Sequence, residues 1–279
     1  MLENSNDTLV ARGYMSRVTC AGDPGQAWQL RTPYEQHRTF WRLFVDQDTR
    51  DFLFREEIPA RRTAGAPRRF LVVSARHPKP AAGLTVETRN YAPQLENGDR
   101  LRFSVRLSVT SAQPVERPTG SGVPLKGRGK VVDPVADALA GIEDAAERRA
   151  MRRRWLLGDS DEAASKREPP LLVPRWLVPK LLRHGLAVDP SATRIVSYEP
   201  AMHQGRKSKD AITFSVAEFS GIASVVDAKL AAHVAFGGIG RGKSLGYGLL
   251  LFARKGIAEV TPRSEANEGD EEEEAPARP

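Results

Sequence analysis

The stretch "GGIGRGKSLGYGLLLFA", residues 237–253, places six glycines and two basic residues immediately before an apolar run. The residues before it, "DAKLAAHVAF", are typical of a helix that Asp227 caps and that the glycines end. The apolar part, "YGLLLFA", is typical of a strand. The stretch therefore predicts a helix, a glycine-rich loop and a closing strand, in that order.

Four positions of this loop satisfy the spacing G-x-x-x-x-G-K-[ST] of a phosphate-binding P-loop: Gly237, Gly242, Lys243 and Ser244. A working P-loop, however, follows a strand and opens a helix whose amino end faces the phosphates. Here the helix comes first, and the first carboxylate after the motif is Glu259, near the end of the chain. We therefore exclude a nucleotide hydrolase and expect no nucleotide cofactor.

With a P-loop excluded, the number of glycines in this loop needs another explanation. A tight turn needs one or two glycines for positive φ angles, but this loop contains six. A glycine-rich backbone beside Arg241 and Lys243 is typical of a surface that an anionic group approaches closely. We expect the loop to bind such a group.

The residues before the loop predict a β, β, α, β order for the carboxyl-terminal half. Two strand-like runs, "TRIVSYEP" and "AITFSVAEFSG", flank the basic loop "AMHQGRKSKD". One predicted helix covers residues 133–157 and is opened by Asp133 and Pro134, and a shorter one in "PRWLVPKLLRHG" ends at Gly185. The capped helix and the closing strand complete this half.

The amino-terminal half has a related pattern. After the strand-like run "YMSRVTC", Thr32, Pro33 and Glu35 supply an N-cap, a proline at the first helical position and a capping box. The helix that they open is expected to end near residue 44. Two strands, "DFLFRE" and "RRFLVVSA", follow, and "DRLRFSVRLSV" alternates strictly over residues 99–109. These elements are most of a βαββαβ unit whose second helix is poorly marked.

Together the halves predict an α+β fold of two tandem ferredoxin-like (βαββαβ) domains. The turn-forming and basic stretch "SAQPVERPTGSGVPLKGRGK" is expected to separate them. The predicted division is an extension at 1–12, a first domain at 13–111, a linker at 112–130, a second domain at 131–258 and an acidic tail at 259–279.

Charge and composition narrow the function. Residues 263–279 hold seven acidic and two basic residues, and without them the chain has 40 basic against 28 acidic residues, a net charge of +12 compared with +7 overall. Such a chain attracts polyanions. The single cysteine and five histidines without metal-ligand spacing predict no disulfide and no metal site. No apolar run approaches the ~20 residues of a membrane helix and no secretory signal is evident, so we expect a cytoplasmic protein.

Motifs at both ends of the chain match one known pattern. Residues 238–250 read G-I-G-x-x-K-x-x-G-x-G-L-L, "YMSRV" is similar to an opening strand M-Y-L-S-R-V, and "PYEQHRTFWRLF" is similar to a helix P-Y-x-x-H-x-x-(L/F)-W-x-x-F, with "RDFLFRE" as the strand after it. Over about residues 13–255 the chain thus resembles the CasE family, the CRISPR repeat-processing ribonucleases of type I-E systems. It departs from that family's R-A-N-P motif, in whose place "RLSVTSA" stands.

The resemblance implies tandem ferredoxin-like domains of the RRM/RAMP type and sequence-specific cleavage of the stem-loop in the CRISPR repeat transcript. It also implies that the mature guide RNA stays bound to the enzyme within the Cascade complex. The implied partners are therefore repeat RNA and other Cascade subunits, without a metal, a nucleotide, another cofactor or a membrane.

RNA carries its own nucleophile, the 2′-hydroxyl, so its cleavage requires proton transfer and charge stabilisation but no obligatory metal. His37 lies three residues after Tyr34, on the same helix face, and imidazole has a suitable pKa of about 6.5. Because the resembled family uses both positions, we predict His37 as general acid or base and Tyr34 as its partner in orienting the 2′-hydroxyl or phosphate. Lys243 is the candidate that neutralises the pentavalent phosphorane.

Basic and loop residues predict the RNA-binding surface, which should rely on phosphate contacts and loop insertion. Its predicted members are Arg38, Arg42, Lys126, Arg128, Lys130, Arg206, Lys207, Lys209, Gly238, Gly240, Arg241, Gly242 and Ser244. The basic run at 148–155 is equally compatible with RNA binding, a solvated helix face or a contact to another subunit. The rival hypothesis is a non-catalytic RNA-binding subunit of a CRISPR complex with the same fold, and the Tyr34/His37 pair favours the enzyme.

Overall fold

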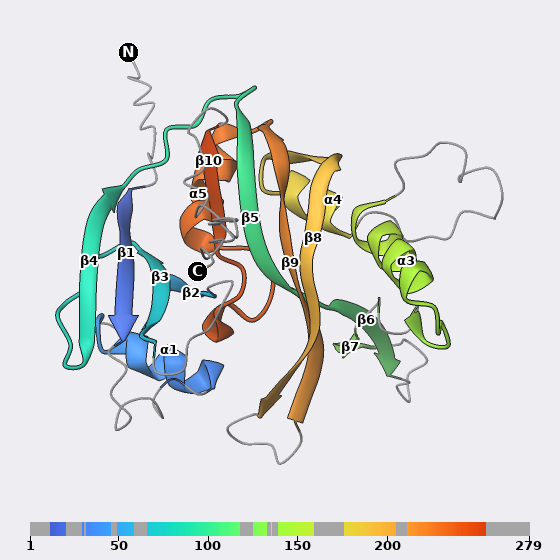
Figure 1. Cartoon of the computed structure of the whole chain (residues 1–279), viewed down its shortest axis with the longest axis horizontal. Helices are drawn as coiled ribbons and strands as arrows, with labels where there is room; N and C mark the ends of the chain where they lie inside the picture. Colours follow the sequence, from blue (N-terminus) through green and yellow to red (C-terminus); the bar gives the residue numbers. More distant parts are fainter. Residues whose placement is uncertain are drawn as a thin grey trace, which may run out of the picture.

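The computed structural model is an α+β protein with two four-stranded antiparallel sheets and a separate two-stranded hairpin (Figure 1). It describes residues 12–20, 30, 32–45, 49–58, 66–117, 125–132, 135, 139–158, 176–204 and 211–254.

Both sheets have the strand order of a ferredoxin-like unit. The first sheet, in the order β2-β3-β1-β4, consists of β1 (Gly13–Cys20), β2 (Phe52–Glu57), β3 (Arg68–Ser74) and β4 (Leu84–Tyr91). The second sheet, in the order β10-β5-β9-β8, consists of β5 (Arg100–Val109), β8 (Leu186–Gln204), β9 (Ala211–Val225) and β10 (Leu250–Arg254). Counted along the chain within each sheet, both orders are 4-1-3-2, as in a βαββαβ unit. The predicted fold class is confirmed.

The strand predicted over residues 99–109 belongs to the other half. β5 pairs with β9 and β10 and is the first strand of the second sheet, whereas β4 closes the first sheet. The expectation that this strand completes a first domain ending at residue 111 was therefore wrong. Strict alternation shows that one face of a strand is buried, but it does not say against which partner. β4 was missed because its sequence, "LTVETRNY", has no continuous apolar face and it is only half-buried.

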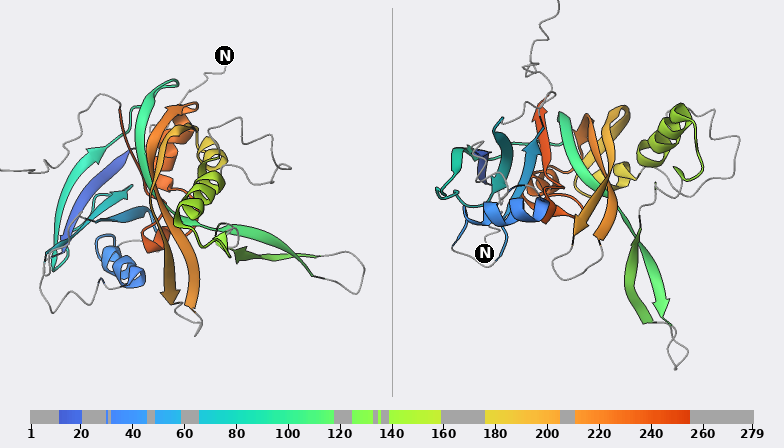
Figure 2. Two further views of the ribbon diagram at one scale, coloured as in Figure 1. Left: turned by 45° about the vertical axis from the view of Figure 1, so that its right-hand side comes forward. Right: turned by 60° about the horizontal axis from the view of Figure 1, so that its bottom comes forward.

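The stretch expected as a linker, 112–130, is largely a hairpin. β6 (Ser111–Arg117) and β7 (Leu125–Val132) pair antiparallel with a register shift between Gln113 and Val115. In Figure 2 this hairpin projects away from both sheets. Turn-forming composition did not prevent pairing, because each arm supplies the hydrogen-bond partners of the other.

The first helix, α1 (Pro33–Trp41), begins where the capping box predicts. The Thr32 hydroxyl accepts the Glu35 amide N–H at 3.2 Å, and the Glu35 carboxylate accepts the Thr32 amide N–H at 2.8 Å. The helix ends before the predicted residue 44, but Leu43 and Phe44 after it are buried in the same hydrophobic cluster. Phe40 contacts the rings of Phe54 and Phe70, with centroids 4.8 and 4.9 Å away.

The helix predicted over residues 133–157 is interrupted. Gly141 has a φ of +82°, and Asp144 starts a new helix, α3 (Ala145–Leu157), by accepting the Glu147 amide N–H at 2.7 Å. The short helix α4 (Leu177–Leu182) and the helix α5 (Ala228–Gly237) form where they were predicted. Both contribute buried side chains to the core of the second sheet, among them Leu177, Leu181, Ala231 and Val234.

An apolar cluster joins the two sheets. Leu53 and Val73 of the first sheet pack with Leu249, which lies just before β10. Phe236 of α5 extends this cluster toward β1, where a Cβ atom at Gly13 would lie 2.6 Å from its ring. Among the helices that the structure describes, none is long and apolar enough to cross a membrane.

Candidate functional site

The glycine-rich loop and α1 meet in the folded chain, although they come from opposite ends of the sequence. Inside the loop, the 3₁₀ turn η3 (Lys243–Leu245) contacts both α1 and β2. Figure 1 shows this turn beside the end of α1. The fold thus brings together the two elements on which the catalytic residues were predicted.

Close packing shapes the glycine-rich loop. Gly238, with a φ of +66°, ends α5, and a Cβ atom there would lie 2.8 Å from Leu53. Gly248 has a φ of +86°, and a Cβ atom there would lie 2.3 Å from the Ile239 carbonyl oxygen. Side chains at these positions would therefore combine backbone strain with steric overlap. The loop lies between a helix and a strand, in the order that excluded a P-loop.

His37 lies half-buried on α1 against a wall of aromatic rings. Its ring stacks near Phe52 and Phe54, with centroids 5.8 and 6.5 Å away and interplanar angles of 30° and 26°. The Trp41 indole N–H donates to Nε2 of His37 at 2.9 Å, so Nε2 is an acceptor and the neutral ring carries its proton on Nδ1. Nδ1 is buried without a hydrogen-bond partner among the described residues.

Burial, together with the positive charge of Arg50, lowers the pKa of His37 below its ordinary value. A lowered pKa keeps the imidazole neutral near pH 7. The ring is therefore in the form that accepts a proton, which is what a general base must do.

Lys243 lies in η3, half-buried, and its ammonium donates to the Gly237 carbonyl oxygen at 2.6 Å. Burial and then the charge of Arg50 lower the pKa of Lys243. The ammonium is thus directed at the backbone where α5 ends and the loop begins.

Arg50 is the residue that sequence reasoning missed. It lies half-buried just before β2, and its positive charge lowers the pKa of both His37 and Lys243. Burial lowers the pKa of Arg50 itself. The available signal was its position at the start of "RDFLFRE", a stretch already matched to the family, where we considered only strand formation.

Further cations extend this surface over α4 and α5. Burial first, and then the charges of Lys243, Arg183, Lys180 and His233, lower the pKa of His184. The pKa of Lys180 is lowered by burial and by Arg183 and Arg241. The neighbours that shift these pKa values are lysine, arginine and histidine side chains, with no carboxylate among them. The surface therefore favours an anionic ligand.

The other predicted residues on α1 differ in their surroundings. Tyr34 is 38% exposed and lies on the same helix face as His37. Arg38 is exposed in the last turn of the helix. Arg42, in contrast, donates to the Ala82 carbonyl oxygen at 2.9 Å, which directs its guanidinium toward the loop before β4.

In the loop, Gly240 and Arg241 are exposed, whereas Gly242 and Ser244 are half-buried at and within η3. These residues and Gly238 lie in the part of the loop that contains Lys243. Three predicted residues lie on β7 of the hairpin, for which the structure describes only the backbone: Lys126, Arg128 and Lys130. Three others fall outside the described residues: Arg206, Lys207 and Lys209.

The basic run at 148–155 is partly used for packing. Arg153 donates to the carbonyl oxygens of Thr193 and Pro190 at 3.0 and 2.9 Å, and the Arg152 guanidinium lies 4.4 Å from the Tyr198 ring centroid. These contacts attach α3 to β8. Among the residues that the structure describes, no three His, Cys, Asp or Glu side chains cluster as metal ligands.

Comparison with solved structures finds the same fold in proteins of low sequence identity. The CRISPR endoribonuclease Cse3 bound to 19 nt RNA is 20% identical, with a TM-score of 0.54 over 87% of this chain and 99% of that one. Cse3 from Thermus thermophilus, bound to an RNA representing a pre-cleavage complex, is 22% identical, with a TM-score of 0.53 over 86% and 98% of the two chains. A search of curated protein sequences gives no match.

Family membership follows from the sequence. The family model described as CRISPR associated protein matches residues 14–254, from the start of β1 to the end of β10. The match includes both the α1 motif and the glycine-rich loop. The chain therefore belongs to the family of CRISPR associated proteins.

Proposed function

We propose that this protein is a metal-independent endoribonuclease that cleaves CRISPR repeat stem-loops in precursor RNA by attack of the 2′-hydroxyl on the adjacent phosphate. The observation that carries the proposal is the contact of α1 with η3, which brings the elements of His37 and Lys243 together within a cationic surface. Family membership and the fold shared with RNA-bound Cse3 support the same reaction class.

In this mechanism the chain supplies proton transfer and charge stabilisation. His37 transfers a proton at the reacting oxygens, as base to the 2′-hydroxyl or as acid to the departing 5′-oxygen. The lowered pKa of His37 favours its role as general base in the free protein. A bound phosphate would raise this pKa and favour the role of general acid. Lys243, together with Arg50, stabilises the additional negative charge of the phosphorane, and Tyr34 orients the 2′-hydroxyl or phosphate.

The free protein holds His37 in a resting arrangement. One ring nitrogen accepts from Trp41 and the other is buried, so substrate contact requires the ring to turn or the indole to move. Side-chain reorientation on RNA binding is ordinary at interfaces and needs no backbone change.

We further propose that the cleaved guide RNA remains bound and that the protein acts in the cytoplasm with other Cascade subunits, as the family resemblance implies. The β6–β7 hairpin and the cationic surface over α4 and α5 are available for an RNA stem and for its phosphates. The alternative, a non-catalytic RNA-binding subunit, would use the same surface without the chemistry.

The deciding experiment incubates the protein with a CRISPR repeat stem-loop RNA in the presence of EDTA. We expect cleavage to continue, and to stop when a single 2′-deoxy nucleotide replaces the one upstream of the cut. Mapping the end groups should give a 2′,3′-cyclic phosphate or its hydrolysis product. Intact RNA bound tightly under these conditions would support the non-catalytic alternative, and cleavage only with added divalent metal would contradict the mechanism.

A further inference from the structure

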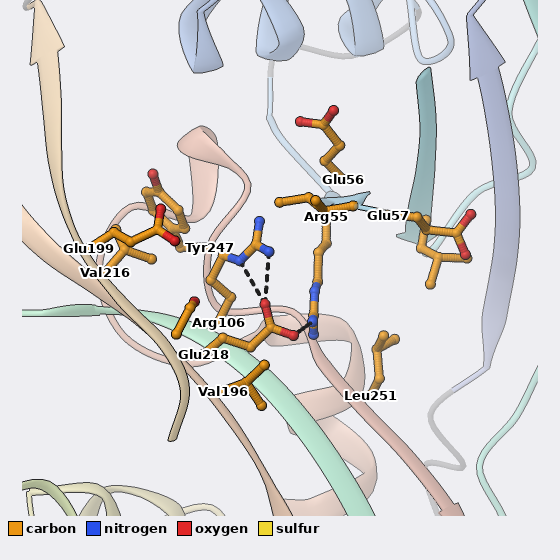
Figure 3. Close-up of a pocket in the computed structure, with 13 residues that line it drawn as sticks. Arg55, Glu56, Glu57, Arg106, Val196, Glu199, Val216, Glu218, Tyr247 and Leu251 are labelled. Carbon is orange, nitrogen blue, oxygen red and sulfur yellow. Dashed lines mark hydrogen bonds and ion pairs between the residues drawn. The ribbon is translucent and has the colours of Figure 1, made fainter. Parts of the chain in front are cut away.

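A cavity of about 580 Å³ lies between the two sheets (Figure 3). Along β2, Phe52 and Phe54 face α1, so Arg55 between Phe54 and Glu56 points to the opposite side, toward the second sheet. Charged and polar side chains from both sheets line the cavity, among them Arg55, Glu57, Arg106, Glu199, Glu218 and Tyr247.

At the floor of this cavity one carboxylate joins the two sheets. Glu218 of β9 accepts from Arg55 of β2 through Oε1 at 2.5 Å, and from Arg106 of β5 through Oε2 at 2.8 and 3.2 Å. Arg55 also donates to the Ser104 hydroxyl at 3.0 Å. The three charged side chains are nearly buried, with exposures of 11% for Arg55, 16% for Glu218 and 17% for Arg106.

Each arginine belongs to a segment that supports one half of the candidate site. Next to Arg55, Phe54 stacks near His37 and lies against the loop, where a Cβ atom at Gly246 would be 3.0 Å from its ring. The backbone carbonyl of Arg106 accepts the Gly248 amide N–H at 2.8 Å. The ion network therefore connects the strand beneath His37 with the strand that holds the end of the Lys243 loop.

Among the described residues the halves also meet through the apolar cluster around Leu53, Val73 and Leu249 and through contacts of α5 and η3 with the first sheet. Apolar burial is non-directional, so it holds the sheets together without setting their relative position to a fraction of an ångström. Charge-assisted hydrogen bonds to both oxygens of one carboxylate are directional and do restrict that position. Breaking such a buried pair leaves charges uncompensated.

RNA is an unsuitable occupant of this cavity. The carboxylates of Glu57, Glu199 and Glu218 line it, and phosphates are repelled by such a lining. Glu57 pairs with Arg17 at 3.3 Å and Glu218 with the two arginines of the network. The network is therefore separate from the cationic surface on which RNA is proposed to bind.

We propose that Glu218, bound to Arg55 and Arg106, is a positioning residue that sets the placement of His37 relative to the Lys243 loop. This inference rests on the proposed nuclease function. It assigns the network an effect on the rate of cleavage rather than on RNA affinity.

The test compares Glu218→Gln with a matched control, Glu56→Gln. Glu56 forms an equally close pair with Arg68, at 2.6 and 2.8 Å, but that pair lies within the first sheet. We expect Glu218→Gln to lower the single-turnover cleavage rate by about tenfold or more while the RNA Kd changes less than about twofold, because misplacement by about 1 Å costs up to ~10²-fold in rate. Glu218→Asp, which keeps the charge, should recover part of the rate, and Glu56→Gln should cleave like the wild type.

A second measurement reads the placement of the sheets without RNA. Spin labels at Glu87→Cys on β4 and Lys229→Cys on α5, both exposed positions, report the distance between the halves by electron–electron double resonance. The native Cys20 does not interfere, because it is buried and burial raises its pKa to about 11. We expect the distance distribution to broaden or shift in Glu218→Gln and to remain unchanged in Glu56→Gln.

The outcomes separate the inference from the function on which it rests. An unchanged rate or an unchanged distance distribution in folded Glu218→Gln would overturn the positioning role, as would equal losses in both variants. If the wild-type protein cuts no repeat RNA, the nuclease proposal fails, and a broadened distribution would then show only that Glu218 fixes the two sheets.

Discussion

The two elements that meet at the candidate site hold their side chains by different means. α1 is stabilised locally, by the reciprocal hydrogen bonds of Thr32 and Glu35 and by aromatic packing on the first sheet. The turn η3 has no side-chain cap, and the loop around it depends on contacts with Leu53, Phe54 and the Ile239 backbone. Substitution of His37 on α1 should therefore change mainly the chemistry, whereas a substitution in the loop should change chemistry, RNA affinity and stability together.

The largest effect on the cleavage rate is expected for His37 on α1. His37→Ala should lower the single-turnover cleavage rate by about 10³-fold, because general acid–base catalysis contributes ~10²–10⁴-fold, while RNA affinity stays within about twofold. His77→Ala removes a histidine that lies outside the candidate site and should cleave normally. A parallel loss of cleavage and binding in His37→Ala would instead make His37 a recognition or folding residue.

In the glycine-rich loop, Lys243→Ala should lower both the cleavage rate and the RNA affinity. We expect a fall of about 10²-fold in rate from lost charge stabilisation, and a decrease of about one in the slope of log K against log salt from the lost phosphate contact. Lys243→Arg should restore the salt slope more fully than the rate, because a guanidinium differs in shape from an ammonium. Single-turnover cleavage measures the rate, and binding assays at several salt concentrations measure the slope; a normal slope in Lys243→Ala would show that Lys243 makes no phosphate contact.

The dependence of the loop on packing can be measured at Gly248. Gly248→Ala combines a positive φ with a close approach to the Ile239 carbonyl oxygen and should cost about 3 kcal/mol of unfolding free energy. Gly98→Ala is the matched control, since Gly98 has a φ of +94° but no atom within 4 Å of the added Cβ, and it should cost only about 1 kcal/mol. Urea denaturation of both variants measures the difference, and equal losses would show that only strain matters.

The smallest effect concerns the Trp41 hydrogen bond. Trp41→Phe removes a donor to Nε2 that favours the neutral ring, so the pKa of His37 should rise toward its ordinary value. In the wild-type protein, as the pH falls, the unfolded state binds a proton at His37 before the folded state does, because the folded-state pKa is lower. The contribution of His37 to stability is therefore complete above pH ~6.5 and is lost as pH falls through the lower folded pKa.

NMR titration of the His37 ring protons in the wild type and in Trp41→Phe checks this prediction. In Trp41→Phe the loss of stability on acidification that comes from protonation of His37 should begin at the same pH, but the total loss should be smaller. A pKa of His37 that stays unchanged would mean that burial and Arg50 alone account for its lowering.

The sequence by itself determined the elements that depend on near neighbours. The capping residues Thr32 and Asp227 predicted where α1 and α5 begin, because an N-cap bond spans only three residues. The order of helix, loop and strand likewise excluded a P-loop. The binding of an anionic group by the glycine-rich loop stays a prediction, since the close approaches in the structure are those of the protein's own groups, among them Leu53, Phe54 and the Ile239 carbonyl.

Only the tertiary structure decided which segments became partners. β5 joined the second sheet, Arg50 came near both His37 and Lys243, and Glu218 met Arg55 across the two sheets. Except for Arg50 and His37, which are 13 residues apart, these pairings join groups more than 100 residues apart in the chain. The physical reason is that a strand's backbone bonds equally well to any suitable edge, and a side chain's charge acts on whatever lies near it. The partner is therefore chosen by the packing of the whole molecule rather than by the local sequence.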